Sequence, residues 1–180
     1  MVNFMTPDFG MKTLKLVEQL KKEPNFYIAG IDDGKTIFGN GLTGYIVPFH
    51  IGEEIDVGRA KSVAKLLKDR YWSEDAMKSM RWVPLPGASD LKPGQDREHP
   101  VRCHLAATDM LAAEWVVENM TCATYPFDVD ARYLKMALQL AKFSGHMDTR
   151  SGYNPLCLWA QDDNGNEIRA VIMRMKEGVT

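Results

Sequence analysis

Two stretches of the chain, separated by a constant offset of 120 residues, repeat the same arrangement of basic and glutamine residues. At about 100° of rotation per residue, these side chains fall on one side of a helix in each stretch. Such a row of long cationic side chains can hold the phosphates of nucleic acid without reading its sequence. The commonest meaning of surface charge is a solvated helix face, and this alternative stays open. The predicted DNA-binding residues are Lys12, Lys15, Gln19, Lys22, Arg132, Lys135, Gln139 and Lys142.

The repeat includes residues outside this charged row. Between segments 8–22 and 128–142 six positions are identical, and Lys12 and Arg132 keep their charge. The identical pairs are Asp8/Asp128, Leu14/Leu134, Lys15/Lys135, Gln19/Gln139, Leu20/Leu140 and Lys22/Lys142. Repetition at a fixed offset predicts a duplicated structural unit that shows the same basic stripe twice.

Three residues between positions 99 and 104 could contribute to a zinc site. They are His99, Cys103 and His104. Structural zinc sites normally use two close pairs of ligands, and no second pair accompanies Cys122 or Cys157. The favoured interpretation is a buried cysteine beside a loop histidine, and no metal site is predicted.

The segment Ser144-Gly-His146-Met-Asp148 contains all three residue types of a hydrolytic triad. Triad residues are brought together by the fold and not by short spacing, and no Gly-x-Ser-x-Gly turn accompanies the segment, so it is interpreted as a helix exit and loop. The glycines match neither a phosphate-binding loop nor a dinucleotide fingerprint. The sequence therefore predicts no catalytic residue and no cofactor. A small hydrolase using His99, Cys103, His104 or His146 is the least favoured class.

Composition excludes several other classes. The net charge of -2 excludes a uniformly basic protein, and 45% hydrophobic with 26% charged residues is typical of a globular domain. No apolar run approaches the roughly 20 residues that span a bilayer, and the N-terminus lacks the pattern of a signal peptide. Three widely spaced cysteines argue against a disulfide framework. A cytoplasmic location without a membrane partner is expected.

Several elements are predicted before residue 82. A helix from about Gly10 to Lys22 buries Leu14, Val17 and Leu20, and Pro24 follows it. Three strands follow, joined by turns at Asp32-Asp33-Gly34 and at Gly39-Asn-Gly-Leu42. The predicted strands are 26–31, 35–38 and 44–49. A second helix between about 56 and 71 buries Ala60, Val63, Ala64 and Leu67 and exposes Lys61, Lys65 and Lys68.

The stretch 82–100 contains four prolines and no periodic pattern, which predicts a long loop joining two halves, about 1–81 and 101–180. Residues 101–120 are ambiguous. Their alanines favour a helix, whereas alternating Val101, Cys103 and Leu105 favour a hairpin that turns near Thr108 and Asp109. The hairpin is slightly favoured.

The second half repeats the order of helix, strand, tight glycine turn and strand. Its helix spans about 130–143, and strands 155–160 and 167–175 flank the turn Asp163-Asn-Gly-Asn166. Helices interleaved with antiparallel hairpins predict an α+β fold of two related halves, with the helices gathered on one face of curved sheet.

Several of these segments resemble DNA sliding clamps, the processivity factors of DNA polymerases. In the last domain of that family, Tyr-Pro enters a helix of the type Tyr-Leu-x-x-Ala-Leu, as at Tyr125-Pro126 and Tyr133-Leu134 here. The family's strand-turn-strand around Ala-Thr-Asp is similar to 105–114. Its closing hydrophobic strand is similar to Ala170-Val-Ile-Met-Arg-Met175.

The resemblance implies a clamp-like domain whose basic helices face DNA. Departures are Arg174 where the family usually has proline, the added segments 56–71 and 82–100, and a length of about one domain where the bacterial clamp has three. A ring would then need several copies, so a homo-oligomer is expected. The favoured function is a non-enzymatic DNA-associated protein or scaffold with duplex DNA or a replication-type protein as partner. The main alternative is a protein-protein interaction module that keeps the fold without binding DNA.

Overall fold

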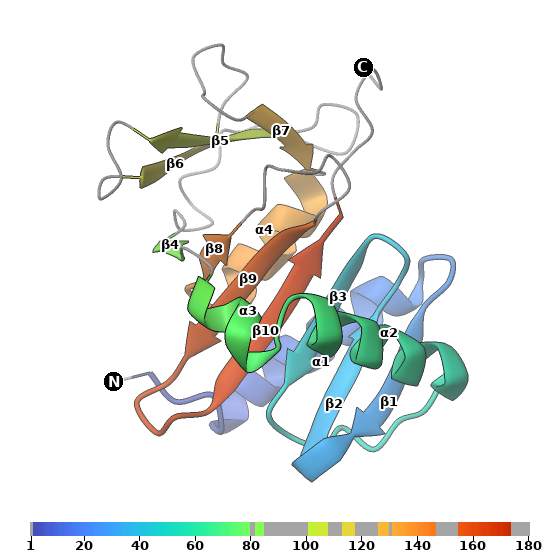
Figure 1. Ribbon diagram of the computed structural model, residues 1–180. Helices are drawn as coiled ribbons and strands as arrows, with labels where there is room; N and C mark the ends of the chain where they lie inside the picture. The colour runs from blue at the N-terminus through green and yellow to red at the C-terminus, as the bar shows by residue number, and fades with distance from the viewer. Residues whose placement is uncertain are drawn as a thin grey trace. The chain divides into compact units, whose positions relative to one another are not determined.

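The computed structural model describes residues 2–79, 82–84, 101–107, 113–117, 126–129, 131–146 and 155–173. The chain divides into two compact units. The first comprises Met1–Arg81 and Trp159–Val171, and the second comprises Trp82–Leu158 and Ile172–Thr180. Both units contain helices and antiparallel strands, so the α+β class predicted from the sequence is confirmed (Figure 1).

The first unit is a sheet with a long helix on each side. Its strands follow one another in the order β1-β2-β3-β10-β9, of which β9 and β10 contribute Trp159–Gln161 and Glu167–Val171 to this unit. Their bounds are β1 Tyr27–Ile31, β2 Lys35–Gly39, β3 Thr43–Val47, β9 Leu156–Gln161 and β10 Glu167–Ile172. The helices are α1 Pro7–Lys21, α2 Val57–Arg70 and the short α3 Glu74–Ser79. The three predicted N-terminal strands, both long helices and the C-terminal strand pair are confirmed within a few residues.

Helix α1 begins three residues earlier than the sequence analysis predicted. Thr6 is its N-cap, and its hydroxyl accepts a hydrogen bond from the Phe9 backbone N–H at 3.3 Å. Pro7 takes the first helical position, where its missing N–H costs nothing, and Asp8 faces the positive end of the helix dipole. These three residues therefore fix the start of the helix.

The earlier start accompanies a different buried face of α1. The buried residues are Phe9, Thr13, Leu16, Val17 and Leu20. The prediction that Leu14 is buried is wrong, because its side chain lies about 120° around the helix from the centre of that face and is 49% exposed. Val17 and Leu20 are buried as predicted, with exposures of 1% and 0%.

Helices α1 and α2 cover opposite faces of the first unit's sheet. Side chains alternate between faces along a strand, yet the consecutive residues Tyr27, Ile28 and Ala29 are all at most 1% exposed. Figure 1 shows α2 in front of this sheet and α1 behind it. The prediction that the helices gather on one face is therefore wrong for this unit, because a continuous apolar strand must be covered on both sides.

The exposure of α2 follows the prediction in part. Ala60 and Leu67 are buried and the three lysines are exposed, whereas Val63 and Ala64 are only half-buried. The difference arises because α2 packs mainly on β1 and less on β2. Part of its sheet-facing side therefore remains accessible.

The strand turns follow the predicted chemistry. Between β1 and β2, Asp33 and Gly34 take positive φ angles of 55° and 76°. Between β2 and β3, the Asn40 side-chain oxygen accepts hydrogen bonds from the backbone N–H groups of Leu42 and Thr43 at 2.8 and 3.0 Å. The second turn sets the register of β2 and β3, which pairs Phe38 with Tyr45. The centres of their stacked rings are 5.3 Å apart.

In the second unit, β5 Val101–Ala107 lies at the centre of a three-stranded sheet, between β6 Ala113–Val117 and β7 Pro126–Val129. Strands β5 and β6 are antiparallel and pair Leu105 with Trp115. Of the two alternatives for residues 101–120, the hairpin is therefore confirmed, and the alternative of a helix is wrong. The predicted turn at 108–109 lies outside the described residues.

The second unit also contains α4 Ala131–Leu140, β8 Ser144–His146 and the two-residue strand β4 Val83–Pro84. Strands β4 and β8 are antiparallel, with Val83 opposite Gly145. Residues 83–84 were predicted to belong to the loop 82–100, and residues 144–146 were also predicted to be a loop. Both predictions are wrong, because these two segments are strands that pair with each other. Residues 85–100 lie outside the described part. The predicted division into related halves stays a prediction.

Candidate functional site

The predicted basic stripe of α1 is exposed. Lys12, Lys15, Gln19 and Lys22 are all on the surface. Lys12 lies 3.9 Å from the Asp8 carboxylate, a pair so exposed that its contribution to stability is small. Among the described residues, Lys15 and Lys22 have no ion-pair partner. Their charges are therefore available to an external anion.

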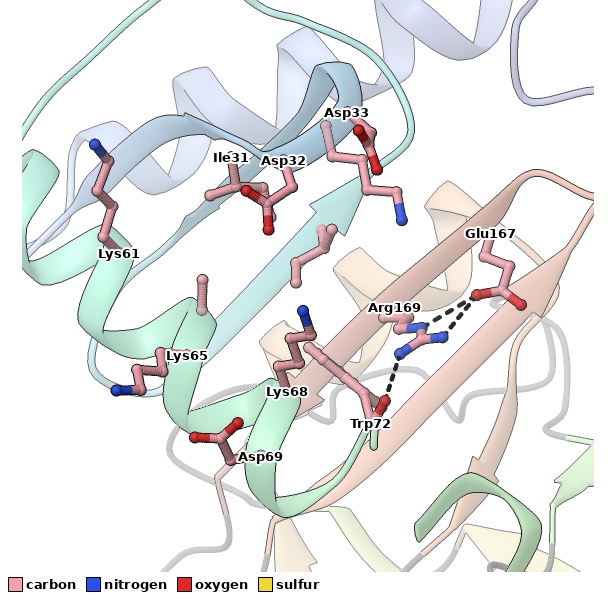
Figure 2. A pocket seen from close by; sticks show the side chains of 13 residues that line it. Ile31, Asp32, Asp33, Lys61, Lys65, Lys68, Asp69, Trp72, Glu167 and Arg169 are labelled. Carbon is pink, nitrogen blue, oxygen red and sulfur yellow. Dashed lines mark hydrogen bonds and ion pairs between the residues drawn. The ribbon is translucent and has the colours of Figure 1, made fainter. Parts of the chain in front are cut away.

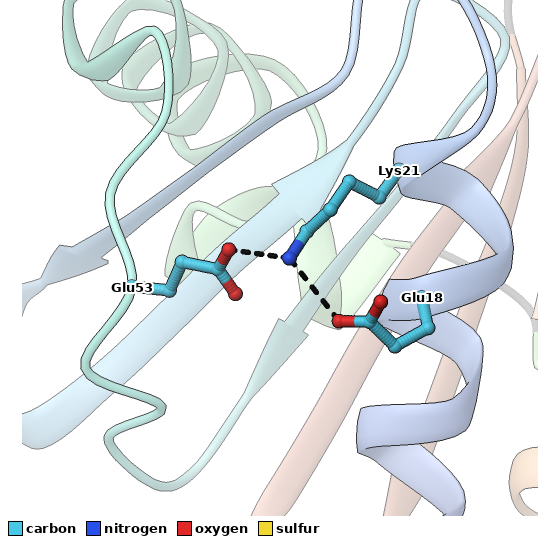
Figure 3. Close-up of polar contacts among 3 residues, drawn as sticks. All are labelled: Glu18, Lys21 and Glu53. Atoms are coloured by element: carbon cyan, nitrogen blue, oxygen red, sulfur yellow. Dashed lines mark hydrogen bonds and ion pairs between the residues drawn. The ribbon is translucent and has the colours of Figure 1, made fainter.

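Lys21, next to this stripe, has a different role. Its ammonium group donates hydrogen bonds to Glu53 and, at 3.1 Å, to Glu18 (Figure 3). The hydrogen bond to Glu53, followed by the one to Glu18, raises the pKa of Lys21 above its ordinary value. The three groups join the end of α1 to the segment that precedes α2. Lys21 is therefore a structural cation and not part of the phosphate-binding set.

The predicted stripe of α4 is exposed at three of its four positions. Lys135, Gln139 and Lys142 are on the surface, whereas Arg132 is half-buried. The Arg132 guanidinium lies 4.5 Å from the centre of the Tyr133 ring, within the range of a cation–π interaction. Arg132 is thus partly committed to its own helix, and Lys135 and Lys142 are the better candidates for contact with a partner.

The two helices share the burial class of many, but not all, of their matched positions. At the offset of 120, Thr13 and Tyr133, Val17 and Ala137, and Leu20 and Leu140 are buried in both helices. The pairs Lys15/Lys135, Gln19/Gln139 and Lys22/Lys142 are exposed in both. Between 12–22 and 132–142, four matched pairs differ in burial, and the largest difference is that Leu134 is 1% exposed and Leu14 is 49% exposed. The four pairs are Lys12/Arg132, Leu14/Leu134, Leu16/Met136 and Glu18/Leu138.

A second candidate site is a hollow of about 760 Å³ between α2 and the sheet of the first unit (Figure 2). Its lining mixes charges of both signs around apolar residues. The cations are Lys35, Lys61, Lys65, Lys68 and Arg169, and the acids are Asp32, Asp33, Asp69 and Glu167. Figure 2 shows Lys68 reaching from α2 toward the strands, whereas Lys65 extends away from them.

Arg169 is held rigidly in the wall of this hollow. Its guanidinium donates to the Glu167 carboxylate at 2.8 and 3.3 Å and to the Trp72 carbonyl at 3.3 Å. It also lies 5.6 Å from the centre of the Trp72 ring. Three of the five guanidinium N–H groups are used in these bonds, so two remain for another acceptor.

The residues considered for enzymatic chemistry form no site in the described structure. Ser144 and His146 lie on β8, with the His146 ring 6.0 Å from Trp82. His99, Asp148 and the side chains of Cys103 and His104 lie outside the described residues. No group of three metal-ligating side chains occurs among the residues that are described. Within the same ranges, no helix combines the length and hydropathy needed to cross a bilayer.

Sequence reasoning identified the lysines of α2 but not the hollow beneath them. Their spacing of four and three residues predicted an exposed face. Arg169 lies within a predicted strand and was not identified as a site residue. Residues two apart point to the same face of a strand, so Glu167, Arg169 and Val171 share one face of β10, and the first two form a charged pair there. This polar interruption of an apolar strand is the signal that could have located the hollow.

No family model and no curated protein matches the sequence. Among solved structures, the chain is similar to the DNA polymerase III subunit beta from Borrelia burgdorferi, determined in complex with a natural product. The similarity has 14% sequence identity and a TM-score of 0.49, and it covers 96% of this chain. The chain spans about three fifths of the length of that subunit, 62% of it.

Proposed function

We propose that this chain is a non-enzymatic, DNA-associated protein of clamp-like fold that contacts the duplex backbone through α1 and α4. The contacting residues are Lys12, Lys15, Gln19, Lys22, Arg132, Lys135, Gln139 and Lys142. Binding is sequence-independent, because flexible lysines pair with phosphates and leave the base edges unread. Several copies, or a replication-type protein partner, hold the duplex, since one clamp domain cannot encircle it.

The observation that supports this proposal best is the shared exposure pattern of α1 and α4. Lys15, Gln19 and Lys22 are exposed in the first unit, and so are their counterparts 120 residues later. Neither Lys15 nor Lys135 has an ion-pair partner among the described residues. A phosphate that binds either lysine therefore displaces no carboxylate.

A titration of fluorescent duplex DNA tests the proposal. The wild type is compared with the double variant Lys15→Glu/Lys135→Glu at low and at moderate salt. Weak binding that falls with salt is expected for the wild type, because phosphate contacts release counterions. Charge reversal at both positions is expected to abolish most of this binding. Both lysines are exposed, so each substitution changes stability by only about 0.5 kcal/mol.

The matched control is Lys61→Glu/Lys65→Glu on α2, which changes the net charge equally on the opposite face of the first unit's sheet. It is expected to retain nearly all duplex affinity. Equal losses of duplex affinity in the two double variants would show that binding depends on the total charge of the protein and not on α1 and α4. Absence of binding at low salt would reject the proposal.

A second function, binding of a protein partner through α1, is favoured by apolar residues beside its stripe. Met11 and Leu14 are 61% and 49% exposed and are three residues apart on the helix. Neighbouring exposed apolar side chains are a feature of interaction surfaces. Replacing both by serine should leave duplex binding unchanged and remove an interaction that depends on this surface, whereas the lysine variants should do the reverse.

A further inference from the structure

The hollow under α2 brings together charges of both signs that do not pair with each other. Lys61, Lys65 and Lys68 come from α2, whereas Asp32 and Asp33 come from the turn between β1 and β2. None of these five side chains forms an ion pair with any other described residue. Both a cationic and an anionic group of the hollow are therefore available to a ligand.

The charge pattern of α2 differs from that of α1 and α3. In those two helices, an acid three or four residues before a lysine pairs with it. In α2, Lys61 precedes Lys65 by four residues, and Lys65 precedes Lys68 by three. Like charges at these spacings repel each other on a helix surface. A negative charge from a ligand would relieve this repulsion.

The acids of the hollow narrow the class of ligand. A ligand with several negative charges would be repelled by Asp32 and Asp33, and one with several positive charges would be repelled by the lysines of α2. Glu167 and Arg169 pair at 2.8 Å and add no net charge to the wall. A ligand with one charge of each sign meets neither repulsion, provided that its anionic end faces α2 and its cationic end faces the turn.

The shape and the apolar lining of the hollow are compatible with such a ligand. Figure 2 shows Asp32 and Lys68, which come from different elements, with their charged ends directed into the same space. Ile31, Ile46 and Ala64 also line the hollow and are only half-buried, so their apolar surface is accessible. The volume of about 760 Å³ lies in the range of roughly 300–1,000 Å³ that is typical of small-molecule sites.

We infer that this hollow binds a small zwitterion with an aliphatic body, of the size and chemistry of a dipeptide of leucine. The ligand carboxylate pairs with the Lys68 ammonium, and the ligand ammonium pairs with the Asp32 carboxylate. The aliphatic side chains of the ligand pack on Ile31 and Ile46. This site is separate from the phosphate-binding set of α1 and α4 and does not depend on duplex binding.

The test is a titration of the full chain with the dipeptide leucyl-leucine, followed by NMR chemical shifts. Two comparison probes keep the aliphatic body but only one charge, because N-acetylation removes the ammonium and C-terminal amidation removes the carboxylate. Leucyl-leucine is expected to bind, and each singly charged probe should bind about fivefold more weakly, as loss of one exposed ion pair would. Equal affinity for either singly charged probe, or no shift change at the hollow with leucyl-leucine, would overturn the inference.

Two variants assign the two ends of the ligand. Lys68→Gln should weaken binding of leucyl-leucine about fivefold but leave binding of the amidated probe unchanged, because that probe has no carboxylate. Asp32→Asn should weaken binding of leucyl-leucine to a similar extent and leave binding of the acetylated probe unchanged. Both side chains are exposed, so neither substitution empties a core position. Unchanged affinity for leucyl-leucine in both variants would overturn the inference.

Lys65→Gln is the matched control for Lys68→Gln, since it makes the same change of charge on the same helix. Lys65 extends away from the strands (Figure 2), so this variant should keep the wild-type affinity for leucyl-leucine. Equal losses in the two variants would show that affinity depends on the total charge of α2 and would overturn the inference. Duplex binding is measured separately on Lys15→Glu, so failure of duplex binding and failure of dipeptide binding are distinguished.

Discussion

The two faces of the first unit's sheet are covered in different ways. On the α1 side, the core is closed around Leu16, Val17 and Leu20, and the stacked pair Phe38 and Tyr45 is fully buried. On the α2 side, Ala60 and Leu67 are buried, but Val63 and Ala64 are only half-buried. The hollow lies on this looser side, with charged side chains in its lining.

This difference predicts different effects of substitution on the two faces. Helix α1 is anchored by its entire inner face, so its outer face can carry lysines without contributing to the core. Helix α2 packs chiefly on β1 and leaves Arg169 and Glu167 of β10 accessible from the hollow. Substitutions on the inner face of α1 should therefore cost the most stability, and substitutions of the exposed lysines around the hollow should cost little stability.

The largest expected effect is that of Leu20→Ala, which empties a fully buried position on α1. A loss of about 2–5 kcal/mol in the free energy of unfolding is expected for a buried leucine. Leu14→Ala on the same helix is the control, with an expected change of about 0.5 kcal/mol because this side chain is exposed. Urea denaturation measures both. Equal losses would contradict the assignment of the α1 buried face.

A smaller loss is expected for Gly39→Ala in β2. A Cβ atom at this position would lie 2.7 Å from the Gly44 Cα and 3.0 Å from the Tyr27 hydroxyl, and it would also clash with the Thr43 carbonyl. Crowding of this kind costs about 1–3 kcal/mol. Thermal denaturation should show a lower melting temperature.

Gly10→Ala and Gly58→Ala are the controls, one in α1 and one in α2. A Cβ atom at either position meets no atom within 4 Å. Alanine in a helix is about 0.5–1 kcal/mol more favourable than glycine, so both variants should melt higher than the wild type. Destabilisation in either helix comparable to that of Gly39→Ala would contradict this account of packing.

A pH-dependent effect is expected at Asp162, which joins the β9–β10 turn to the N-terminus. Its carboxylate accepts hydrogen bonds from the backbone N–H groups of Phe4, Asn164 and Asn166 at 2.8–3.0 Å, and from the Asn166 side chain at 3.1 Å. Burial alone would raise the pKa of Asp162, but these bonds, led by that of Phe4, lower it below its ordinary value. The stabilisation is present above the unfolded-state pKa and is lost as pH falls through the folded-state pKa.

Asp162→Asn tests this effect. Its amide oxygen can still accept from the turn, but its nitrogen cannot accept from the buried Phe4 N–H. The variant should melt lower than the wild type at neutral pH, and the difference should shrink at acid pH below the ordinary aspartate pKa. A difference that is the same at both pH values would contradict the assigned role of the carboxylate.

The sequence predicted the elements better than their packing. Periodic apolar residues and strong turn residues such as Asp33-Gly34 define helices and hairpins locally, so their positions could be predicted. The exposure of Leu14 could not be predicted, because Leu14 and Leu16 are equally apolar and only the packing on the sheet decides which of them is covered. The continuous apolar run Tyr27-Ile28-Ala29 encodes a strand that is covered on both faces, in contrast to the prediction of helices on one face.

The two candidate sites also differ in how much of each could be predicted from the sequence. Exposure of the stripe lysines follows from helix periodicity, which needs no tertiary information. The hollow brings α2 together with Arg169 and Glu167, which lie roughly 100 residues further along the chain, and no local pattern predicts such a juxtaposition. A tertiary structure was needed to place Trp72 and Arg169 in one wall.

The salt dependence of duplex binding tests most directly the claim that α1 and α4 contact DNA while α2 does not. The slope of log affinity against log salt is measured for the wild type, Lys15→Gln, Lys135→Gln and the double variant. Each lost phosphate contact should reduce the slope by about 0.9, and the double variant should lose about twice as much. Lys61→Gln/Lys65→Gln should keep the wild-type slope. An unchanged slope in the Lys15/Lys135 double variant, or an equal reduction in the α2 variant, would contradict the claim.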